Sequence, residues 1–226
     1  MKLLIVTATP MEVAPLVTVL DRLGDEDTRL VRCAAREHDV DVLTTGAGMV
    51  ATATWTARTL AVGAYDAAIN LGICGSFDPA FPAGSVVHVS TDCLAELGAE
   101  DGDQFLTVQE LGLLADDEFP FTGGHLVNQS APAFDTLRRL TEVRGLTVNT
   151  VHGHERSIAG VVARFHPQVE SMEGAAFLCC CLTTGVPCAQ IRAVSNRVER
   201  RNRSAWNLPL AVKALNDTAI EIVAGL

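Results

Sequence analysis

Short apolar stretches of strand length alternate along the chain with longer stretches in which apolar residues recur every three or four positions. The short stretches predict strands at Lys2 to Thr7, Asp41 to Thr45, Ala67 to Leu71, Ser85 to Ser90, Leu146 to Val151 and Cys188 to Val194, and a weaker one at Arg29 to Ala34. The longer stretches predict helices at Met49 to Leu60, Gly174 to Thr183 and Leu208 to Val223, and shorter ones at Pro132 to Leu140 and Arg156 to Phe165. Strands that alternate with helices indicate an α/β fold, in which helices cover both faces of a parallel or mixed sheet.

The chain shows no linker, internal repeat or low-complexity tract, so we expect residues 1–226 to form one domain. Its least regular segment is acidic and runs from Leu94 to Gln129, with Pro120, Gly123 and Gly124 in its second half. A solvated insertion or flap is the simpler interpretation of this segment, and direct contact with a ligand is the alternative.

The charge distribution limits the possible partners. The net charge is −10, and no Lys or Arg occurs between Arg58 and Arg138, which argues against a nucleic-acid groove. No apolar stretch approaches the roughly 20 residues of a membrane span, and the N-terminus lacks the features of a signal peptide. The seven cysteines show no metal-ligand spacing. We therefore expect a cytoplasmic protein with reduced thiols, no metal and no membrane partner.

Three polar residues stand where predicted strands end. Glu12 follows the first strand and opens a helix, Glu173 lies at a strand-to-helix junction, and Asn196 follows the last apolar strand. In open α/β sheets, ligands bind outside the carboxyl ends of the strands. These three side chains are therefore the first candidates for a functional site.

Four segments of the chain carry a resemblance to a known family. They are TATPME from Thr7, NLGICG from Asn70, ESMEGAA from Glu170 and SNRVERRNRSAWN from Ser195. In this order they resemble the nucleoside phosphorylase/nucleosidase superfamily, and the last one is similar above all to the futalosine hydrolases of the alternative menaquinone pathway. The resemblance implies a three-layer fold whose mixed, partly barrel-like central sheet is flanked by helices. It also implies a small nucleoside substrate, no cofactor and a homo-oligomeric assembly.

The resemblance assigns catalytic roles to the two glutamates. Glu12 would hold and activate the attacking water as a general base. Glu173 would accept hydrogen bonds from both ribose hydroxyls and stabilise the cationic sugar, while Met172 packs on the sugar. From position alone, a carboxylate at the start of a helix is also explained by the helix dipole.

Asn196 departs from the adenine-directed relatives, which have Asp at this position to serve N7 of the leaving base. An amide cannot act as a general acid, but it can donate to N7 or to an exocyclic oxygen. Asn196 therefore favours a 6-oxopurine such as hypoxanthine over adenine. A strand-end Asn that caps a turn is the alternative.

The other expected contacts surround these three residues. The resemblance places Ile73, Cys74 and Gly75 in a glycine-rich turn near the nucleophile and the base, with Val151 and Ser195 also lining the pocket. Arg203 and Trp206 would bind the aromatic carboxylate of futalosine, although a solvated basic loop is the alternative. The related phosphorylases bind phosphate through an Arg in place of Asn70, whose lack of charge favours water as the acceptor.

Together these expectations describe an N-glycosyl hydrolase that cleaves futalosine to hypoxanthine and dehypoxanthine futalosine. Three alternatives remain open. The first is a methylthioadenosine/S-adenosylhomocysteine or aminofutalosine nucleosidase, the second a phosphorylase, and the third a non-catalytic nucleoside-binding protein on the same fold.

Overall fold

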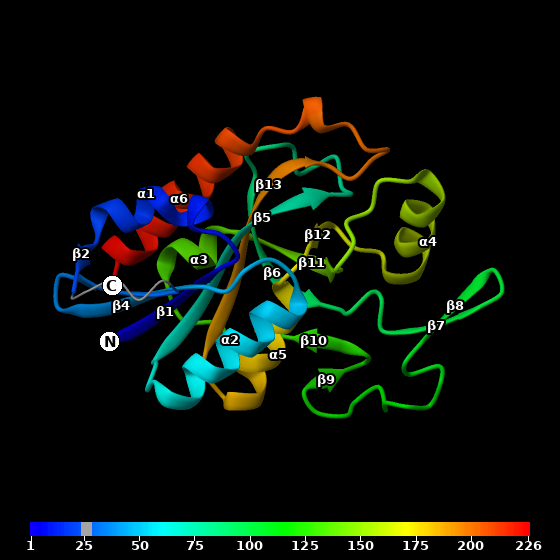
Figure 1. Cartoon of the computed structure of the whole chain (residues 1–226), viewed down its shortest axis with the longest axis horizontal. Helices are drawn as coiled ribbons and strands as arrows, with labels where there is room; N and C mark the ends of the chain where they lie inside the picture. Colours follow the sequence, from blue (N-terminus) through cyan, green and yellow to red (C-terminus); the bar gives the residue numbers. More distant parts are fainter. Residues whose placement is uncertain (24–28) are drawn as a thin grey trace.

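A mixed β-sheet forms the centre of the molecule, and helices pack on its two sides (Figure 1). The structure is a computed structural model that describes residues 1–23 and 29–226. The strands within these residues are β1 (Lys2–Thr7), β2 (Asp21–Arg22), β3 (Leu30–Ala35), β4 (His38–Thr44), β5 (Ala67–Ser76), β6 (Val86–Asp92), β7 (Gly98–Asp101), β8 (Gln104–Thr107), β9 (Phe121–Thr122), β10 (His125–Val127), β11 (Thr141–Thr147), β12 (Val169–Ser171) and β13 (Cys188–Arg197). The helices are α1 (Pro10–Val19), α2 (Met49–Val62), α3 (Asp135–Arg139), α4 (Glu155–Phe165), α5 (Gly174–Thr184) and α6 (Leu208–Ala224).

Part of the sheet closes on itself. The strands follow the order β2-β3-β4-β1-β5-β12-β11-β6-β10-β9, and β13 pairs with both β5 and β6. Strands β5, β12, β11, β6 and β13 therefore form a closed ring. Its interior is filled by side chains from all five strands, namely Cys74, Val87, Val89, Val143, Val169 and Val194. The predicted α/β fold with a mixed, partly barrel-like sheet between helices is confirmed.

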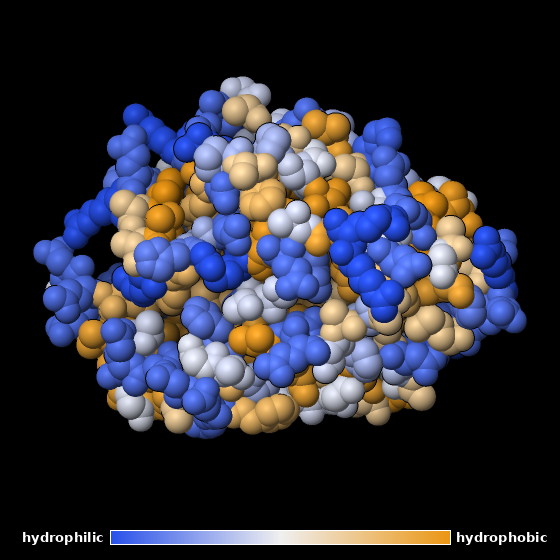
Figure 2. All heavy atoms as spheres, turned by 180° about the vertical axis from the view of Figure 1, so that it is seen from behind, coloured by the Kyte–Doolittle hydropathy of each residue, from blue (hydrophilic) through white to orange (hydrophobic). Residues whose placement is uncertain are grey.

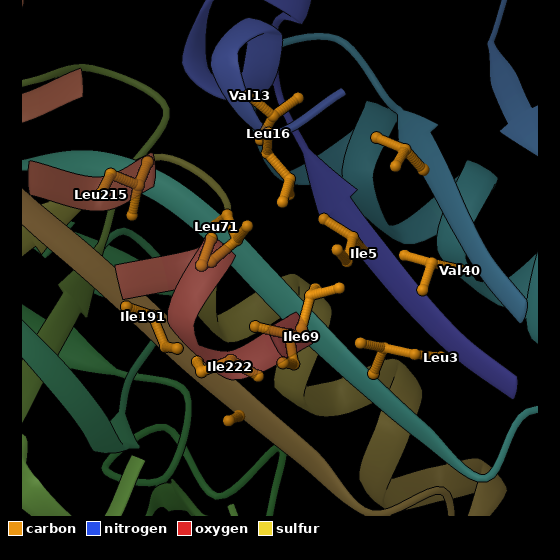
Figure 3. Close-up of a cluster of buried hydrophobic side chains, with 14 of the residues drawn as sticks. Leu3, Ile5, Val13, Leu16, Val40, Ile69, Leu71, Ile191, Leu215 and Ile222 are labelled. Carbon is orange, nitrogen blue, oxygen red and sulfur yellow. The ribbon is translucent and has the colours of Figure 1, made fainter. Parts of the chain in front are cut away.

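The largest apolar cluster lies between the sheet and helices α1 and α6 (Figure 3). Leu3 and Ile5 of β1 and Ile69 of β5 face Leu16 of α1 and Ile222 of α6. The alternating positions of β1 instead point to a second cluster, which includes residues of α5. Because β1 and β5 are buried on both faces, their sequences are nearly continuous apolar runs.

The surface away from this core is largely polar. Seen from behind, the hairpin of β7 and β8 projects from one edge of the molecule as a hydrophilic arm (Figure 2). The two chain ends lie on the opposite side (Figure 1). Among the described residues, none of the helices has the length and apolarity needed to cross a membrane.

The expected elements are present, but several of the predicted bounds are wrong. The strand expected at Leu146 to Val151 is β11, which ends at Thr147. Beyond it, the N–H groups of Asn149 and Thr150 are bound by the Glu96 carboxylate instead of a neighbouring strand. The helix expected at Pro132 to Leu140 is the five-residue α3.

The segment from Leu94 to Gln129 is more regular than the sequence indicates. It forms the β7–β8 hairpin and a second hairpin of β9 and β10, and β10 joins the main sheet beside β6. These strands have two to four residues, which is too short for a periodic pattern to reveal them.

Candidate active site

Glu12 lies in the first turn of α1, and its side chain reaches back to two segments. One carboxylate oxygen, Oε2, accepts from the Thr9 N–H at 2.9 Å and from the Thr7 and Thr9 hydroxyls. The other, Oε1, accepts from the Ile73 N–H of β5 at 3.2 Å. Glu12 thus forms a capping box with Thr9, a helix-start role different from the dipole effect expected as the alternative, and this role occupies only one of its two oxygens. The second oxygen connects Glu12 to the glycine-rich turn.

Arg192, a fully buried cation beside Glu12, was not among the site residues predicted from the sequence. Its guanidinium donates to the Asn70 side chain, and its Nη1 lies 3.4 Å from the Asn70 carbonyl oxygen. A Cβ atom on Gly72 would lie 3.0 Å from Arg192 Nη1 and 3.3 Å from Glu12 Oε1. Both charged groups thus approach Gly72, whose lack of a Cβ atom leaves room for them. An arginine inside an apolar strand was the available signal.

Glu173 stands at the N-cap of α5 and is also buried. Its Oε1 accepts from the Gly48 N–H at 3.0 Å, where the chain enters α2 with a positive φ of 91°. Burial raises the pKa of Glu173, and the charge of Arg192 opposes this rise. Gly48 was not predicted, although the pair of glycines after the β4 stretch was a possible signal.

The three charged groups sum to one negative charge when both carboxylates are ionised. Asn70 itself carries no charge, as the sequence shows, but the neighbouring strand β13 supplies a cation at this point, Arg192. However, this guanidinium is enclosed, fully buried, and offset by Glu12 and Glu173. The local charge therefore disfavours a phosphate dianion.

An irregularity in β13 determines the position of Asn196. The pairing of β13 with β5 shifts between Val194 and Asn196, so that Asn196 lies opposite Gly75. The Ser195 hydroxyl lies 3.1 Å from the Cys74 carbonyl oxygen and 2.7 Å from Asn196 Oδ1. The Asn196 amide donates to the Arg197 carbonyl at 2.8 Å. Both ends of the Asn196 side chain are thus oriented.

The side chains of the other predicted contact residues point in different directions. Ile73 offers its N–H to Glu12, while its side chain packs toward α1 and α6. Cys74 points into the closed ring, and burial raises the pKa of its thiol to about 12. Met172 is half-buried directly before Glu173, whereas Val151 packs against the apolar cluster beneath α4.

The basic segment after Asn196 folds back along the site. Asn207 N–H donates to the Ser195 carbonyl, and Arg201 N–H donates to the Gly153 carbonyl. Trp206 is half-buried, and the cation 5.8 Å from its ring is Arg201. Arg203 is exposed in a short 3₁₀ turn. Its contact with a substrate carboxylate stays a prediction.

Comparison with known proteins agrees with this architecture. The profile of the phosphorylase superfamily matches residues 2–224. The chain is 34% identical to a futalosine hydrolase of Streptomyces coelicolor, covering 96% of this chain and 93% of that protein. It is 31% identical to a futalosine hydrolase of Acidothermus cellulolyticus, covering 95% and 87%.

Among solved structures, a 5′-methylthioadenosine/S-adenosylhomocysteine nucleosidase of Colwellia psychrerythraea in complex with adenine has the same fold. Its TM-score is 0.80 at 22% identity, and the match covers 100% of this chain and 96% of that one. Because the identity is low, this likeness speaks for the fold alone. From the family profile and the two sequence relatives, the chain belongs to the phosphorylase superfamily and, within it, to the family of the futalosine hydrolases.

Proposed function

We propose that the chain is a nucleosidase that hydrolyses the N-glycosidic bond of futalosine. The products are hypoxanthine and dehypoxanthine futalosine, a step of the futalosine pathway of menaquinone biosynthesis. The observation that carries the proposal is the buried group of Glu12 and Glu173, each at the start of a helix, together with Arg192 of β13. Two relatives with more than 30% identity are named futalosine hydrolases.

Glu12 is the general base of the proposed mechanism. A water at its Oε1 donates a hydrogen bond to this oxygen and accepts one from the Arg192 guanidinium across Gly72. When this water attacks, Glu12 takes its proton. The Ile73 N–H fixes the carboxylate in that direction. General-base assistance of this kind typically contributes a factor of about 10²–10⁴ to the rate.

Glu173 holds the sugar in this mechanism. Its Oε1 is fixed by the Gly48 N–H, and the remaining acceptor positions of the carboxylate accept from the ribose hydroxyls. As the bond to the base breaks, positive charge develops on the sugar. A buried carboxylate that is already oriented stabilises this charge without reorganisation. Met172, which directly precedes Glu173, packs against the same sugar.

Asn196 receives the leaving base, next to the backbone of Cys74, Gly75 and Ser195. Its amide donates to N7 or O6 of hypoxanthine, both of which are acceptors. At an adenine, N7 would still accept, but the exocyclic amino group in place of O6 would oppose a donor at that position. Hypoxanthine is therefore the preferred base.

Water is the proposed acceptor because the charge of the site opposes phosphate. Glu12 and Glu173 together exceed the single charge of Arg192, so a phosphate dianion would be repelled. In the same proposal Arg203 and Trp206 bind the aromatic carboxylate of the substrate. The enzyme would act in the cytoplasm as a homo-oligomer, without a cofactor.

Product identification tests the proposal. Purified protein is incubated with futalosine, its 6-amino analogue, methylthioadenosine and S-adenosylhomocysteine, and the products are identified by mass spectrometry. Fastest cleavage of futalosine, with hypoxanthine and dehypoxanthine futalosine as products, supports the proposal. Preferential release of adenine would assign the chain to the 6-amino nucleosidases, and absence of any release would favour a binding protein.

A further inference from the structure

A buried acid–imidazole pair lies beside the proposed site and has no role in the mechanism described so far. Glu170 is in the middle of β12, and His152 is in the segment that follows β11. The His152 N–H donates to Glu170 Oε1 at 3.0 Å, and its ring Nδ1 contacts Oε2. The Glu170 side chain is only 3% exposed and the His152 side chain 12%. Burying a carboxylate at this depth carries a large desolvation penalty, which suggests a functional reason for its position.

Strand pairing places Glu170, Gly75 and Asn196 side by side on three neighbouring strands, and we call these three residues the row. Glu170 of β12 lies opposite Gly75 of β5, which in turn lies opposite Asn196 of β13. Residues directly opposite in paired strands project to the same face. This face is the outside of the closed ring, because Cys74 and Val169 point to its inside. The shift of pairing at Ser195 is what brings Asn196 into this row.

The row has a polar group at each end and an apolar middle. Because the ring is curved, the backbones of β12 and β13 are separated by at most twice the spacing of neighbouring strands, about 10 Å. A Cβ atom on Gly75 would lie 2.7 Å from Val198 Cγ2, so the Val198 side chain covers the glycine. An apolar floor with few convergent polar groups is the usual design of a pocket for a flat heterocycle.

The distance of the row from the catalytic groups also matches the distance from sugar to base in a nucleoside. Gly75 is two residues beyond Ile73, Asn196 is four beyond Arg192, and Glu170 is three before Glu173. At the rise of an extended chain these separations correspond to roughly 7–13 Å, which suits the distance from sugar to base in a nucleoside. The Arg201–Gly153 hydrogen bond joins the two loops that flank the row.

We propose that Glu170, oriented by His152, is a specificity-determining residue that accepts the N1–H of a 6-oxopurine base. An ionised carboxylate has about four acceptor positions, and His152 occupies two of them. Hypoxanthine carries a hydrogen on N1, whereas adenine presents a lone pair there. Glu170 would therefore recognise N1 of the base, and Asn196 the adjacent edge with O6 and N7. The inference rests on the proposed function.

Glu170→Gln tests the inference most directly. The amide oxygen keeps an acceptor for the His152 N–H, while the new amino group opposes the N1–H of hypoxanthine and can donate to N1 of adenine. We expect kcat/KM for futalosine to fall about a hundredfold or more. The 6-amino analogue should lose less, so the ratio of the two kcat/KM values should shift at least tenfold toward it.

Glu96→Gln is the matched control. Glu96 binds the N–H groups of Asn149 and Thr150, so it anchors the same loop through the same kind of contact, away from the row. An unchanged substrate ratio in Glu96→Gln together with a changed ratio in Glu170→Gln supports the proposal. An equal shift in both variants, or none in Glu170→Gln, overturns it. If Glu170→Gln does not fold, His152→Ala replaces it, with a smaller shift in the same direction expected and an unchanged ratio overturning the proposal.

Binding of the free bases separates this inference from the proposed function. Calorimetric titration of the wild-type protein with hypoxanthine and with adenine requires no turnover. If no nucleoside is cleaved, the proposed function fails, but tighter binding of hypoxanthine that is lost in Glu170→Gln still supports the role of Glu170. Equal binding of both bases by wild type and variant overturns it.

Discussion

Arg192 determines the electrostatics of the site at the scale of single residues. Its guanidinium is fully buried and lies between Asn70, Glu12 and the charge of Glu173. Burial alone would favour the neutral form of Glu173, and the nearby cation counteracts this effect. An ionised Glu173 is the form that the proposed mechanism needs. Arg192 is therefore as important for the proposed reaction as the carboxylates.

Glu173→Gln tests the role of this charge. The glutamine keeps an acceptor for the Gly48 N–H, so the loop before α2 stays in place. It removes the negative charge that stabilises the cationic sugar. We expect kcat to fall roughly a hundredfold or more, with an unchanged circular-dichroism spectrum. Glu142→Gln, which alters an exposed carboxylate of β11, should retain full activity. Near-normal turnover by a correctly folded Glu173→Gln protein would refute the assigned role.

Sequence motifs identified some of these residues and missed others for a physical reason. Glu12, Glu173 and Asn196 lie at strand ends, where a polar residue interrupts an apolar run and can be recognised. Arg192 lies inside such a run, and its role depends on its position across from Gly72 of another strand. Pairing of strands far apart in the sequence determines this contact, so the residue types alone could not predict it.

At the scale of elements, the N-terminus of α5 is supported by a buried polar group beneath Glu173. The Thr147 hydroxyl donates to Asp92 at 3.0 Å and accepts from the Ala175 N–H at 2.8 Å. Asp92 also accepts from the Gln190 amide at 3.1 Å. These contacts satisfy an otherwise unpaired N–H in the first turn of the helix. They therefore fix the end of α5 at which Glu173 stands.

Gly174 is required by this arrangement. A Cβ atom there would lie 1.9 Å from Gln190 Nε2 and 2.4 Å from Asp92 Oδ2. Gly174→Ala should therefore lower the free energy of unfolding by about 1–3 kcal/mol, measured by denaturant titration, and also reduce kcat. Gly160→Ala is the matched control, because a Cβ at this position of α4 meets nothing within 4 Å. That control should be neutral or slightly stabilising. Equal stability of the two variants would contradict the packing account.

Asp92 makes stability depend on pH. Burial raises its pKa to about 6, although its hydrogen bonds and Arg192 oppose the rise. Between about pH 4 and 6 the folded protein therefore holds a proton that the unfolded chain releases. The free energy of unfolding should fall as the pH rises through this window, by roughly 3 kcal/mol at most. Asp92→Asn should remove this part of the slope. Parallel pH profiles for wild type and variant, from chemical denaturation, would show that Asp92 titrates normally.

The positions of the elements were more predictable than their ends. The first strand was predicted with its observed bounds because both faces of β1 are buried and its apolar run ends at a turn. The end of β11 was misplaced because buried apolar residues such as Val148 continue beyond the last paired residue. In β1 the buried residues and the paired residues end at the same position, whereas in β11 the buried residues continue beyond the paired ones. The sequence pattern indicates only which residues are buried.

At the scale of the whole molecule, the closed ring and the two helical layers bury nearly all thiols. All seven cysteines are free, and only Cys179 is partly exposed. Burial raises the pKa of Cys74, Cys93 and Cys180 in the same way. We expect the native protein to react rapidly with a thiol reagent at one position at most, and the unfolded protein at seven. Fewer than seven reactive thiols after unfolding without reductant would reveal a disulfide.

The central claim is hydrolysis with water as the acceptor, and phosphate dependence tests it most directly. The initial rate of hypoxanthine release from futalosine is measured in phosphate-free buffer and again with added phosphate. The site of Glu12, Arg192 and Glu173 predicts equal rates and an unphosphorylated sugar product in both. Release that requires phosphate and yields a ribosyl phosphate would contradict the account and assign the chain to the phosphorylases.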